Sequence, residues 1–344
     1  MRRGPALAAT IGALLLTLSG SGSAQVETPK LTVAVGGQPL YIYLPLTLAQ
    51  QLGYFKDAGI DIDIVDLAGG AKALESLLGG SASATRGFID HTIEMQAQGK
   101  NIKMFVLYDR YPGLVLAVTK AGQARGIKSI GDLKGAKIGV TAPGSSTQFF
   151  AEYLLAKYGI PVDQESYIGV GTATTAVAAA RRGVVDALVN VDPTITILTQ
   201  NGDAQVLTDT RTTLGTLGVF GGPYAAGGLY ASPNFIERNP KTVEALTVAS
   251  VKALHWIKAH TPAQIADVMP AQFYQSDKAL YVASLKENLE MFSPDGRIPL
   301  TGLQTIAKVL SSFDKGVVAN AGKVNPPAAF TNEFVDEAHK MLKF

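Results

Sequence analysis

Hydrophobic and polar positions repeat along this chain in a pattern that alternates between helices and strands. The clearest stretch begins with an apolar helix over 44–52, which ends at Gly53. A strand with alternating Ile and Asp follows over 60–65, and Gly69-Gly70 opens the next helix. Glycine is favoured after a helix because it adopts left-handed backbone angles at little steric cost, and period-two alternation is typical of a strand.

The same alternation extends over most of the chain. It predicts strands followed by helices, an order that favours mostly parallel sheets with helices on both faces. The predicted strands lie at 31–35, 60–65, 82–85, 103–108, 114–118, 137–140, 166–170, 187–190 and 227–231. The predicted helices lie at 44–52, 71–78, 90–98, 145–158, 172–182, 240–259, 261–269, 276–291, 301–311 and 332–342.

Two breaks in the pattern predict a division into two lobes. Residues 119–126 are polar and contain glycine, and Gly221-Gly222-Pro223 interrupts regular structure. We therefore expect lobe I to comprise 25–119 and 223–344, with the C-terminal helices packed on it, and lobe II to comprise 120–222. A chain of 344 residues with 47% hydrophobic content can bury cores of this size.

The first 24 residues fit a secretory signal peptide. Arginines at positions 2–3 precede an apolar run over 6–18 and small residues at 22–24. The run is short for a membrane span, so we prefer a cleaved signal over an N-terminal anchor and expect a mature periplasmic chain from about Gln25. Removing the two arginines leaves equal numbers of basic and acidic residues, which argues against a nucleic-acid partner.

The composition excludes several classes of chemistry. The chain has no cysteine, which excludes disulfides, thiolate metal sites, a cysteine nucleophile and a lipid-modified cysteine. No GxSxG, HExxH or paired metal-ligand spacing occurs. We therefore predict a non-catalytic protein without a metal or cofactor.

Three segments resemble one family. The GYFKDAGI turn at 53–60, the segment SIGDLKGAKIGVTAPGSSTQFFAEYLLAKYGI at 129–160 and GVVDA at 183–187 are similar to periplasmic substrate-binding proteins of ABC importers. The branch is that of aliphatic-sulfonate, taurine, nitrate and thiamine-precursor pyrimidine binders. The resemblance covers most of 30–230 and implies a two-lobed α/β fold, the type II periplasmic binding fold. It also implies a monomer that captures a small organic anion and docks on an inner-membrane ABC permease.

Ligand sites of open α/β sheets lie beyond the carboxyl ends of the strands. Four loops each end a predicted strand and precede a predicted helix, namely 36–41, 68–71, 87–91 and 141–147. They supply the candidate ligand-binding residues Gln38, Tyr41, Gly69, Gly70, Phe88, His91, Gly144, Ser145, Ser146 and Thr147.

The fourth loop carries the strongest indication. Gly144 lets the backbone approach a ligand, and Ser145, Ser146 and Thr147 place hydroxyls beside the first N–H groups of a helix, which favour an anion. The alternative is that Ser145 or Ser146 only caps the helix. Gly69-Gly70 permits either close ligand approach or a tight turn, and its loop lacks the spacing of a nucleotide-binding P-loop.

Each of the remaining candidates also has a structural interpretation. His91 is either a packed residue or a ligand contact. Arg110 pairs either with a carboxylate or sulfonate ligand or with a protein acid such as Asp109. Asn190 and Asp192 end a strand and are candidates for receiving an amine or hydroxyl. Tyr41, Phe88 and Tyr224 are either apolar walls of the site or core residues.

Two other functions remain as alternatives. A thiamine-precursor pyrimidine binder would have the same fold. The resemblance also includes related enzymes that use a lysine-linked cofactor and a cysteine-rich segment, but the lack of cysteine and the export signal oppose that reading. A transcription regulator would need a helix-turn-helix segment, which the pattern does not show.

Overall fold

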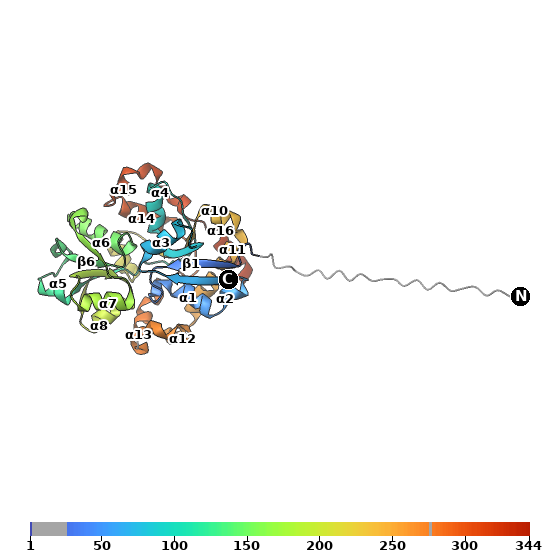
Figure 1. The fold of residues 1–344 in the computed structure, drawn as a ribbon, viewed down its shortest axis with the longest axis horizontal. Coiled ribbons are helices and arrows are strands. Elements are labelled where there is room, and N and C mark those ends of the chain that lie inside the picture. The colour runs from blue at the N-terminus through green and yellow to red at the C-terminus, as the bar shows by residue number, and fades with distance from the viewer. Residues whose placement is uncertain (2–25, 275–276) are drawn as a thin grey trace.

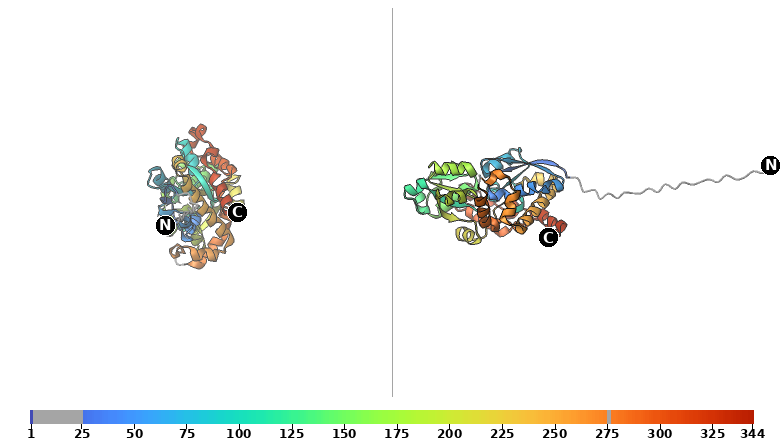
Figure 2. Two further views of the ribbon diagram at one scale, coloured as in Figure 1. Left: turned by 90° about the vertical axis from the view of Figure 1, so that its right-hand side faces the viewer. Right: turned by 90° about the horizontal axis from the view of Figure 1, so that it is seen from below.

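The computed structural model describes Met1, residues 26–274 and residues 277–344. The predicted signal peptide, apart from Met1, lies outside these residues, as does the first residue of the predicted helix at 276–291. The described chain forms two mixed β-sheets, each flanked by helices (Figures 1 and 2). The predicted α/β fold with two lobes is confirmed.

The first sheet has the strand order β2-β1-β3-β10-β4. β1 (Lys30–Val35) pairs in parallel with β2 (Asp61–Asp66) and with β3 (Ala84–Phe88). β10 (Gly227–Ala231) lies antiparallel between β3 and β4 (Lys103–Asp109). Four of the five strands therefore run in one direction. The exception is β10, which the chain forms after it returns from the other lobe.

The second sheet repeats this arrangement in the order β7-β6-β8-β5-β9. β6 (Lys137–Val140) is parallel to β7 (Ser166–Gly169) and to β8 (Ala187–Asn190). β5 (Val115–Thr119) lies antiparallel between β8 and β9 (Ala204–Asp209). Each sheet thus contains one antiparallel strand that follows a crossing between the lobes.

The placement of β5 corrects one prediction. We expected the strand at 114–118 in lobe I and a crossing at 119–126, and both expectations were wrong. Val115 pairs with Asn190 and Asp209 of the second sheet, so the chain crosses directly after β4. All five β5 residues are buried, and an apolar strand of this kind suits the interior of either sheet.

Helices that connect or cover the strands of the first sheet come from both ends of the described chain. They are η1 (Tyr41–Tyr43), α1 (Leu44–Gln51), α2 (Tyr54–Asp57), α3 (Gly70–Leu78), α4 (Asp90–Ala97), α10 (Pro233–Arg238), α11 (Pro240–Ala259), α12 (Pro262–Val268), α13 (Lys278–Asn288), α14 (Leu300–Leu310), α15 (Lys315–Ala319) and α16 (Glu333–Leu342). The long α11 packs on α1, α16 and β4. Of the C-terminal helices, α13 also touches α8 and α14 also touches α6 in the second lobe.

The helices of the second lobe surround its sheet, in green and yellow-green in Figure 1. They are α5 (Lys120–Ala124), α6 (Ser146–Lys157), α7 (Ala173–Arg181), α8 (Thr194–Gln200) and α9 (Thr213–Phe220). The sequence analysis missed α8, β9 and α9, because threonine, glutamine and glycine dilute the hydrophobic pattern between residues 194 and 220.

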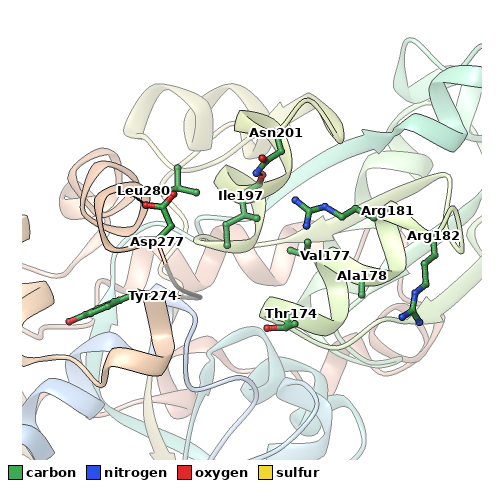
Figure 3. A pocket seen from close by; sticks show the side chains of 10 residues that line it. All are labelled: Thr174, Val177, Ala178, Arg181, Arg182, Ile197, Asn201, Tyr274, Asp277 and Leu280. Carbon is green, nitrogen blue, oxygen red and sulfur yellow. Dashed lines mark hydrogen bonds between the residues drawn. The ribbon is translucent and has the colours of Figure 1, made fainter.

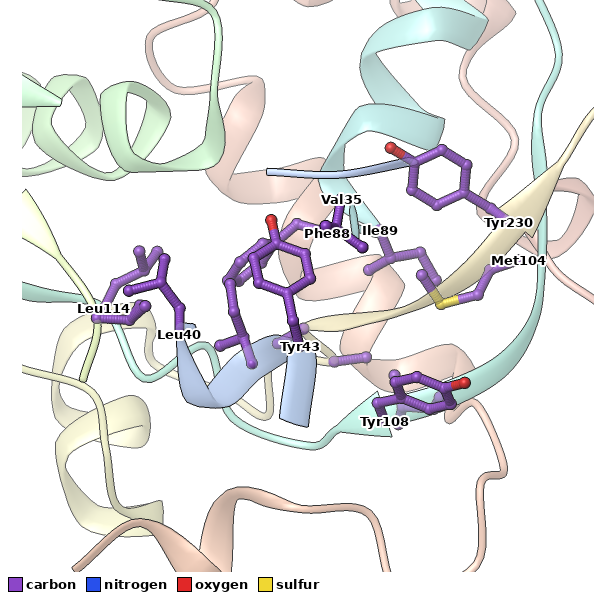
Figure 4. Close-up of a cluster of buried hydrophobic side chains, with 14 of the residues drawn as sticks. Val35, Leu40, Tyr43, Phe88, Ile89, Met104, Tyr108, Leu114 and Tyr230 are labelled. Atoms are coloured by element: carbon purple, nitrogen blue, oxygen red, sulfur yellow. The ribbon is translucent and has the colours of Figure 1, made fainter. Parts of the chain in front are cut away.

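A buried ion pair connects β3 to β4 beneath the first crossing. The Arg86 side chain donates to the Asp109 carboxylate, and both side chains are fully buried. The Arg86 guanidinium also lies 4.9 Å from the ring centre of Tyr43 and 5.7 Å from that of Tyr108. Burial lowers the pKa of Arg86 to about 10, so the guanidinium remains charged at neutral pH. Figure 4 shows the two tyrosines within the surrounding apolar cluster.

Glycines of β10 allow this strand to fit between β3 and β4. A Cβ atom on Gly228 would lie 1.9 Å from the Val106 carbonyl oxygen, whereas a Cβ atom on Gly218 of α9 would meet nothing within 4 Å. We predict that Gly228→Ala lowers the free energy of unfolding by about 1–3 kcal/mol, because overpacking forces the backbone to shift. Urea unfolding followed by circular dichroism measures the change.

The matched control is Gly218→Ala. Alanine is favoured over glycine in a helix by about 1 kcal/mol, so this variant should be as stable as the parent or slightly more stable. Equal midpoints for the two variants would show that β10 tolerates a side chain at residue 228.

Candidate ligand-binding site between the lobes

The loops at the carboxyl ends of the strands meet between the two lobes and enclose a small cavity, the interlobe cavity. Its volume is about 20 Å³, close to the smallest volume that admits one water molecule, about 10–15 Å³. It is lined by Gly36, Leu40, Ile42, Tyr43, Gly70, Phe88, Leu114, Thr141, Ser145, Ser146, Thr147 and Val191. The lobes are therefore closed on each other.

Five of the predicted site residues line this cavity: Gly70, Phe88, Ser145, Ser146 and Thr147. Gly69 lies beside them, since a Cβ atom there would be 2.8 Å from the Ala142 side chain. The glycines at the start of α3 thus allow the backbone of lobe I to approach the α6 loop of lobe II.

The serine hydroxyls connect the lobes instead of capping α6. Ser145 precedes α6 without a side-chain capping bond, and its Oγ accepts from the Ala71 N–H of α3 at 3.0 Å. The Ser146 Oγ donates to Asp90 Oδ1 at 2.8 Å. Thr147 Oγ1 accepts from the Thr141 N–H at 3.0 Å within lobe II. The capping interpretation is therefore wrong for Ser145, whose hydroxyl binds an N–H group of the other lobe.

His91 and Gly144 form a further contact between the lobes. His91 Nε2 lies 3.4 Å from the Gly144 carbonyl oxygen, and Nδ1 lies 3.4 Å from the Tyr230 hydroxyl. The ring packs edge-on against Phe149 of α6 at 5.8 Å between ring centres. His91 is fully buried and is not among the residues that line the cavity. It contacts the loop that carries Gly144.

The structure places six predicted site residues away from the cavity lining. Gln38 Nε2 donates to Thr47, and the Tyr41 hydroxyl donates to the Tyr281 carbonyl at 2.7 Å. Tyr224 stacks on Phe220 with ring centres 4.2 Å apart. The other three are Asn190, Asp192 and Arg110.

These three polar side chains form hydrogen bonds with other groups of the protein. Asn190 Nδ2 donates to the Gly171 carbonyl at 3.3 Å. Asp192 accepts from Arg211 Nη1 at 2.9 Å and from Asn288 Nδ2 at 2.7 Å. Arg110 donates to the carbonyl of Glu290 at 2.7 Å. Asp192 therefore joins lobe II to α13, and Arg110 lies outside the cleft.

The sequence analysis missed seven residues of the lining. They are Gly36, Leu40, Ile42, Tyr43, Leu114, Thr141 and Val191, and Figure 4 shows four of the apolar walls, Leu40, Tyr43, Phe88 and Leu114. Five of them are apolar, and apolar residues alone do not distinguish a ligand wall from the core. The sequence did indicate Gly36 and Thr141 as possible site residues, because each directly follows a strand.

Arg181 and Arg182 line a separate groove of about 430 Å³ between α7, α8 and the start of α13 (Figure 3). Arg181 Nε donates to Asp203 Oδ2 at 2.7 Å. This contact agrees with a structural role for Arg181 at the end of α7. The groove shares no lining residue with the interlobe cavity.

Among residues 26–274 and 277–344 there is no helix long and apolar enough to cross a membrane. The same residues contain no cluster of three or more metal-ligating side chains.

The two-lobed architecture is that of solved periplasmic binding proteins. The nitrate-binding protein NrtA from Synechocystis PCC 6803 superposes with a TM-score of 0.71 at 14% identity, covering 93% of this chain and 90% of that one. The alkanesulfonate-binding protein SsuA from Xanthomonas axonopodis, bound to MOPS, superposes with a TM-score of 0.69 at 19% identity. The match covers 89% of this chain and 99% of SsuA. A protein from Bordetella bronchiseptica RB50 superposes with a TM-score of 0.90 at 43% identity. The match covers 93% of this chain and 100% of the Bordetella chain. This chain has the substrate-binding-protein fold of ABC-type import.

The chain belongs to the family described as NMT1/THI5 like, which matches residues 42–264. The Bacillus subtilis protein YtlA, whose name describes it as a binding protein, is 23% identical over 302 residues, covering 83% of this chain and 84% of YtlA. The Saccharomyces cerevisiae 4-amino-5-hydroxymethyl-2-methylpyrimidine phosphate synthase THI13 is 27% identical over 169 residues, 48% of this chain and 47% of the synthase. The resemblance found in the sequence is therefore confirmed at the level of the family.

Carboxylates of both lobes gather behind the cavity. Burial, together with the nearby charges of Asp90 and Asp314, raises the pKa of Glu94 on α4 to about 8. Burial also raises the pKa of Glu152 on α6, against a hydrogen bond from Gln148. Glu94 and Glu152 come from different lobes, and burial favours the protonated form of each.

This arrangement predicts that stability falls with rising pH. An unfolded glutamate titrates near pH 4.3, so between about pH 4 and 8 the folded chain keeps a proton on Glu94 that the unfolded chain has lost. The free energy of unfolding then decreases as the pH rises through this range. We expect the melting temperature to drop by several degrees from about pH 5 to about pH 8, as measured by calorimetry.

Glu94→Gln should flatten this dependence, since the amide does not titrate. The exposed Glu75 of α3, whose side chain is 63% accessible, supplies the control Glu75→Gln, which should keep the slope of the parent. A Glu94→Gln variant with the parent's slope would contradict the assignment.

Proposed function

We propose that this protein is the extracytoplasmic solute-binding component of an ABC importer, which captures a small organic anion between its lobes and delivers it to an inner-membrane permease. The observation that carries the proposal is the meeting of two helix starts at the cavity, where the Ala71 N–H of α3 reaches Ser145 Oγ at the start of α6. The first N–H groups of a helix lack partners within the helix and carry partial positive charge. Two such starts favour an anionic group.

The lining of the cavity supports a ligand with one anionic head and an apolar body. Hydroxyls of Thr141, Ser145 and Ser146 lie on the lobe II side, and Tyr43 and Phe88 lie on the lobe I side. None of the described residues that line it carries a charge. A monoanion such as an alkanesulfonate or a carboxylate fits this lining better than a dianion, which would need cationic side chains to offset its desolvation.

Binding then requires the lobes to separate. A cavity of about 20 Å³ is too small for an organic anion, so the ligand enters an open form and the lobes close around it, as in other hinge-closing proteins. The two crossings, after β4 and before β10, are the only covalent links between the sheets in the described chain. The sequence supports export through its signal-like N-terminus, and we propose a periplasmic monomer.

A thiamine-precursor pyrimidine is the second candidate ligand. The family match and the partial similarity to a yeast pyrimidine phosphate synthase favour it, as do the aromatic rings of Tyr43 and Phe88, which suit a planar heterocycle. Catalysis is less well supported, because the chain has no cysteine and no lysine occurs among the described residues that line the cavity.

A thermal-shift screen of the mature chain from Gln25 tests the proposal. A ligand that binds only the folded state stabilises it by about 2.7 kcal/mol at a hundredfold excess over its Kd. We expect a rise in melting temperature with alkanesulfonates or aromatic carboxylates and none with their uncharged analogues. A response to pyrimidines alone would establish the second candidate, and no response to any of these compounds would overturn both.

A pair of variants at Gly144 tests the position of the anion. Gly144 has φ +79°, and its Cβ would point toward Ala71 at 3.6 Å, so a side chain there reaches both helix starts. Gly144→Asp should abolish binding of the anion, because its carboxylate takes the place of the ligand. Isothermal titration with the best ligand of the screen measures the effect.

Gly144→Asn is the matched control, since asparagine has nearly the same size, tolerates left-handed backbone angles and carries no charge. It should bind the anion more tightly than Gly144→Asp, while Arg181→Ala should bind it like the parent. Retained affinity in Gly144→Asp would place the ligand elsewhere.

A further inference from the structure

Arg110, one of the candidate ligand-binding residues, lines a second pocket outside the cleft. This pocket, the hinge pocket, lies between the end of α11 and the segment 289–294, and its volume is about 310 Å³. That volume falls at the lower end of the range of small-molecule sites, about 300–1,000 Å³. The apolar side chains of Leu254, Ile257, Leu289 and Phe292 form part of its lining, so it can take an apolar body the size of one ring.

The polar side chains that line the pocket are mostly basic. Arg110, Lys258 and His260 face a single acid, Glu290. Arg110 Nη2 lies 3.4 Å from Glu290 Oε1, whereas Lys258 forms no ion pair with any residue in the described part of the chain. With His260 neutral, the lining carries one net positive charge. An anionic head is therefore favoured over a neutral or cationic one.

The pocket adjoins the first crossing between the lobes. The Arg110 N–H donates to the Met291 carbonyl at 2.8 Å, and the Ser293 N–H donates to the Tyr108 carbonyl at 2.7 Å, so one wall of the pocket is tied to the end of β4. The next residue, Tyr111, donates to Glu290 Oε1 at 3.5 Å and lies against Thr213 of α9 in lobe II. Glu290 therefore contacts both Arg110 and the crossing.

We propose that the hinge pocket is a second ligand site, which binds a small monoanion with an apolar body, such as an aromatic carboxylate. Its carboxylate pairs with Lys258 and Arg110, and its ring packs on Leu254 and Phe292. The ligand competes with Glu290 for Arg110, so its occupancy changes the contacts that Glu290 makes with Tyr111 and Thr213. This site does not depend on the proposed function of the interlobe cavity.

Ligand-observed NMR and isothermal titration of the mature chain with phenylacetate test the site, with phenylacetamide as the uncharged probe of the same shape. We expect phenylacetate to bind more tightly than phenylacetamide by about tenfold, since only the acid pairs with the two cations. Lys258→Gln should weaken phenylacetate binding several-fold, and Arg110→Gln with Lys258→Gln should weaken it to the level of the amide. Lys258→Gln keeps every contact of Arg110, so it remains informative if the double variant fails to fold.

The control pair Lys286→Gln with Lys308→Gln removes two exposed lysines from the neighbouring helices α13 and α14 and should leave the affinity unchanged. Because the interlobe cavity is itself expected to take aromatic carboxylates, these variants are made in the Gly144→Asp background, which blocks that cavity and should retain phenylacetate binding at the hinge pocket. The proposal is overturned by equal binding of acid and amide, by unchanged affinity in Lys258→Gln, by loss of binding in Gly144→Asp, or by no binding at millimolar concentration.

Discussion

The buried ion pair between Arg86 and Asp109 holds the first sheet together at the point where the chain leaves it. β10 lies between β3 and β4, so the two charged side chains meet across a strand that returns from the other lobe. A Cβ atom on Gly227 would lie 2.4 Å from Arg86 Nη1, and glycine at this position is what gives the guanidinium its space. Removing one partner of a buried pair leaves an uncompensated charge, which costs about 3–5 kcal/mol. Asp109 is the last residue of β4 before the crossing, and the Arg86 guanidinium lies against the Tyr43 ring that lines the cavity.

Closure of the lobes combines polar contacts with an apolar cluster that continues from one lobe into the other. Ser145 with Ala71, Ser146 with Asp90, and Asp192 with Asn288 each join groups from different lobes. A hydrogen bond between protein groups contributes about 0.5–1.5 kcal/mol net, because water replaces it when it breaks. A ligand of micromolar affinity supplies about 8 kcal/mol. A single bound anion therefore contributes more than any one of these hydrogen bonds.

The fold and the family narrow the function without selecting the ligand. Unrelated activities share folds, so function is argued from the site. Here the site offers hydroxyls, helix starts and two aromatic rings but no charged lining side chain. This combination distinguishes it from a site for dianions and leaves sulfonates, carboxylates and pyrimidines as ligands to compare. The cationic side chain expected in the cleft, Arg110, belongs instead to a pocket at the hinge.

The sequence by itself determined the order of strands and helices and the loops that meet between the lobes. Local periodicity and glycine positions placed α1, α3, β6 and α11 to within about two residues, and the loop with Ser145 was identified because helix starts follow strands in this fold. Tertiary structure decided which sheet β5 joins, that Ser145 reaches the other lobe, and that Asp192 and Arg110 bind protein groups. Local sequence encodes the conformation of a segment through its own propensities, whereas the partner of a buried strand or a polar side chain depends on residues distant in the chain, which only the folded structure brings into contact.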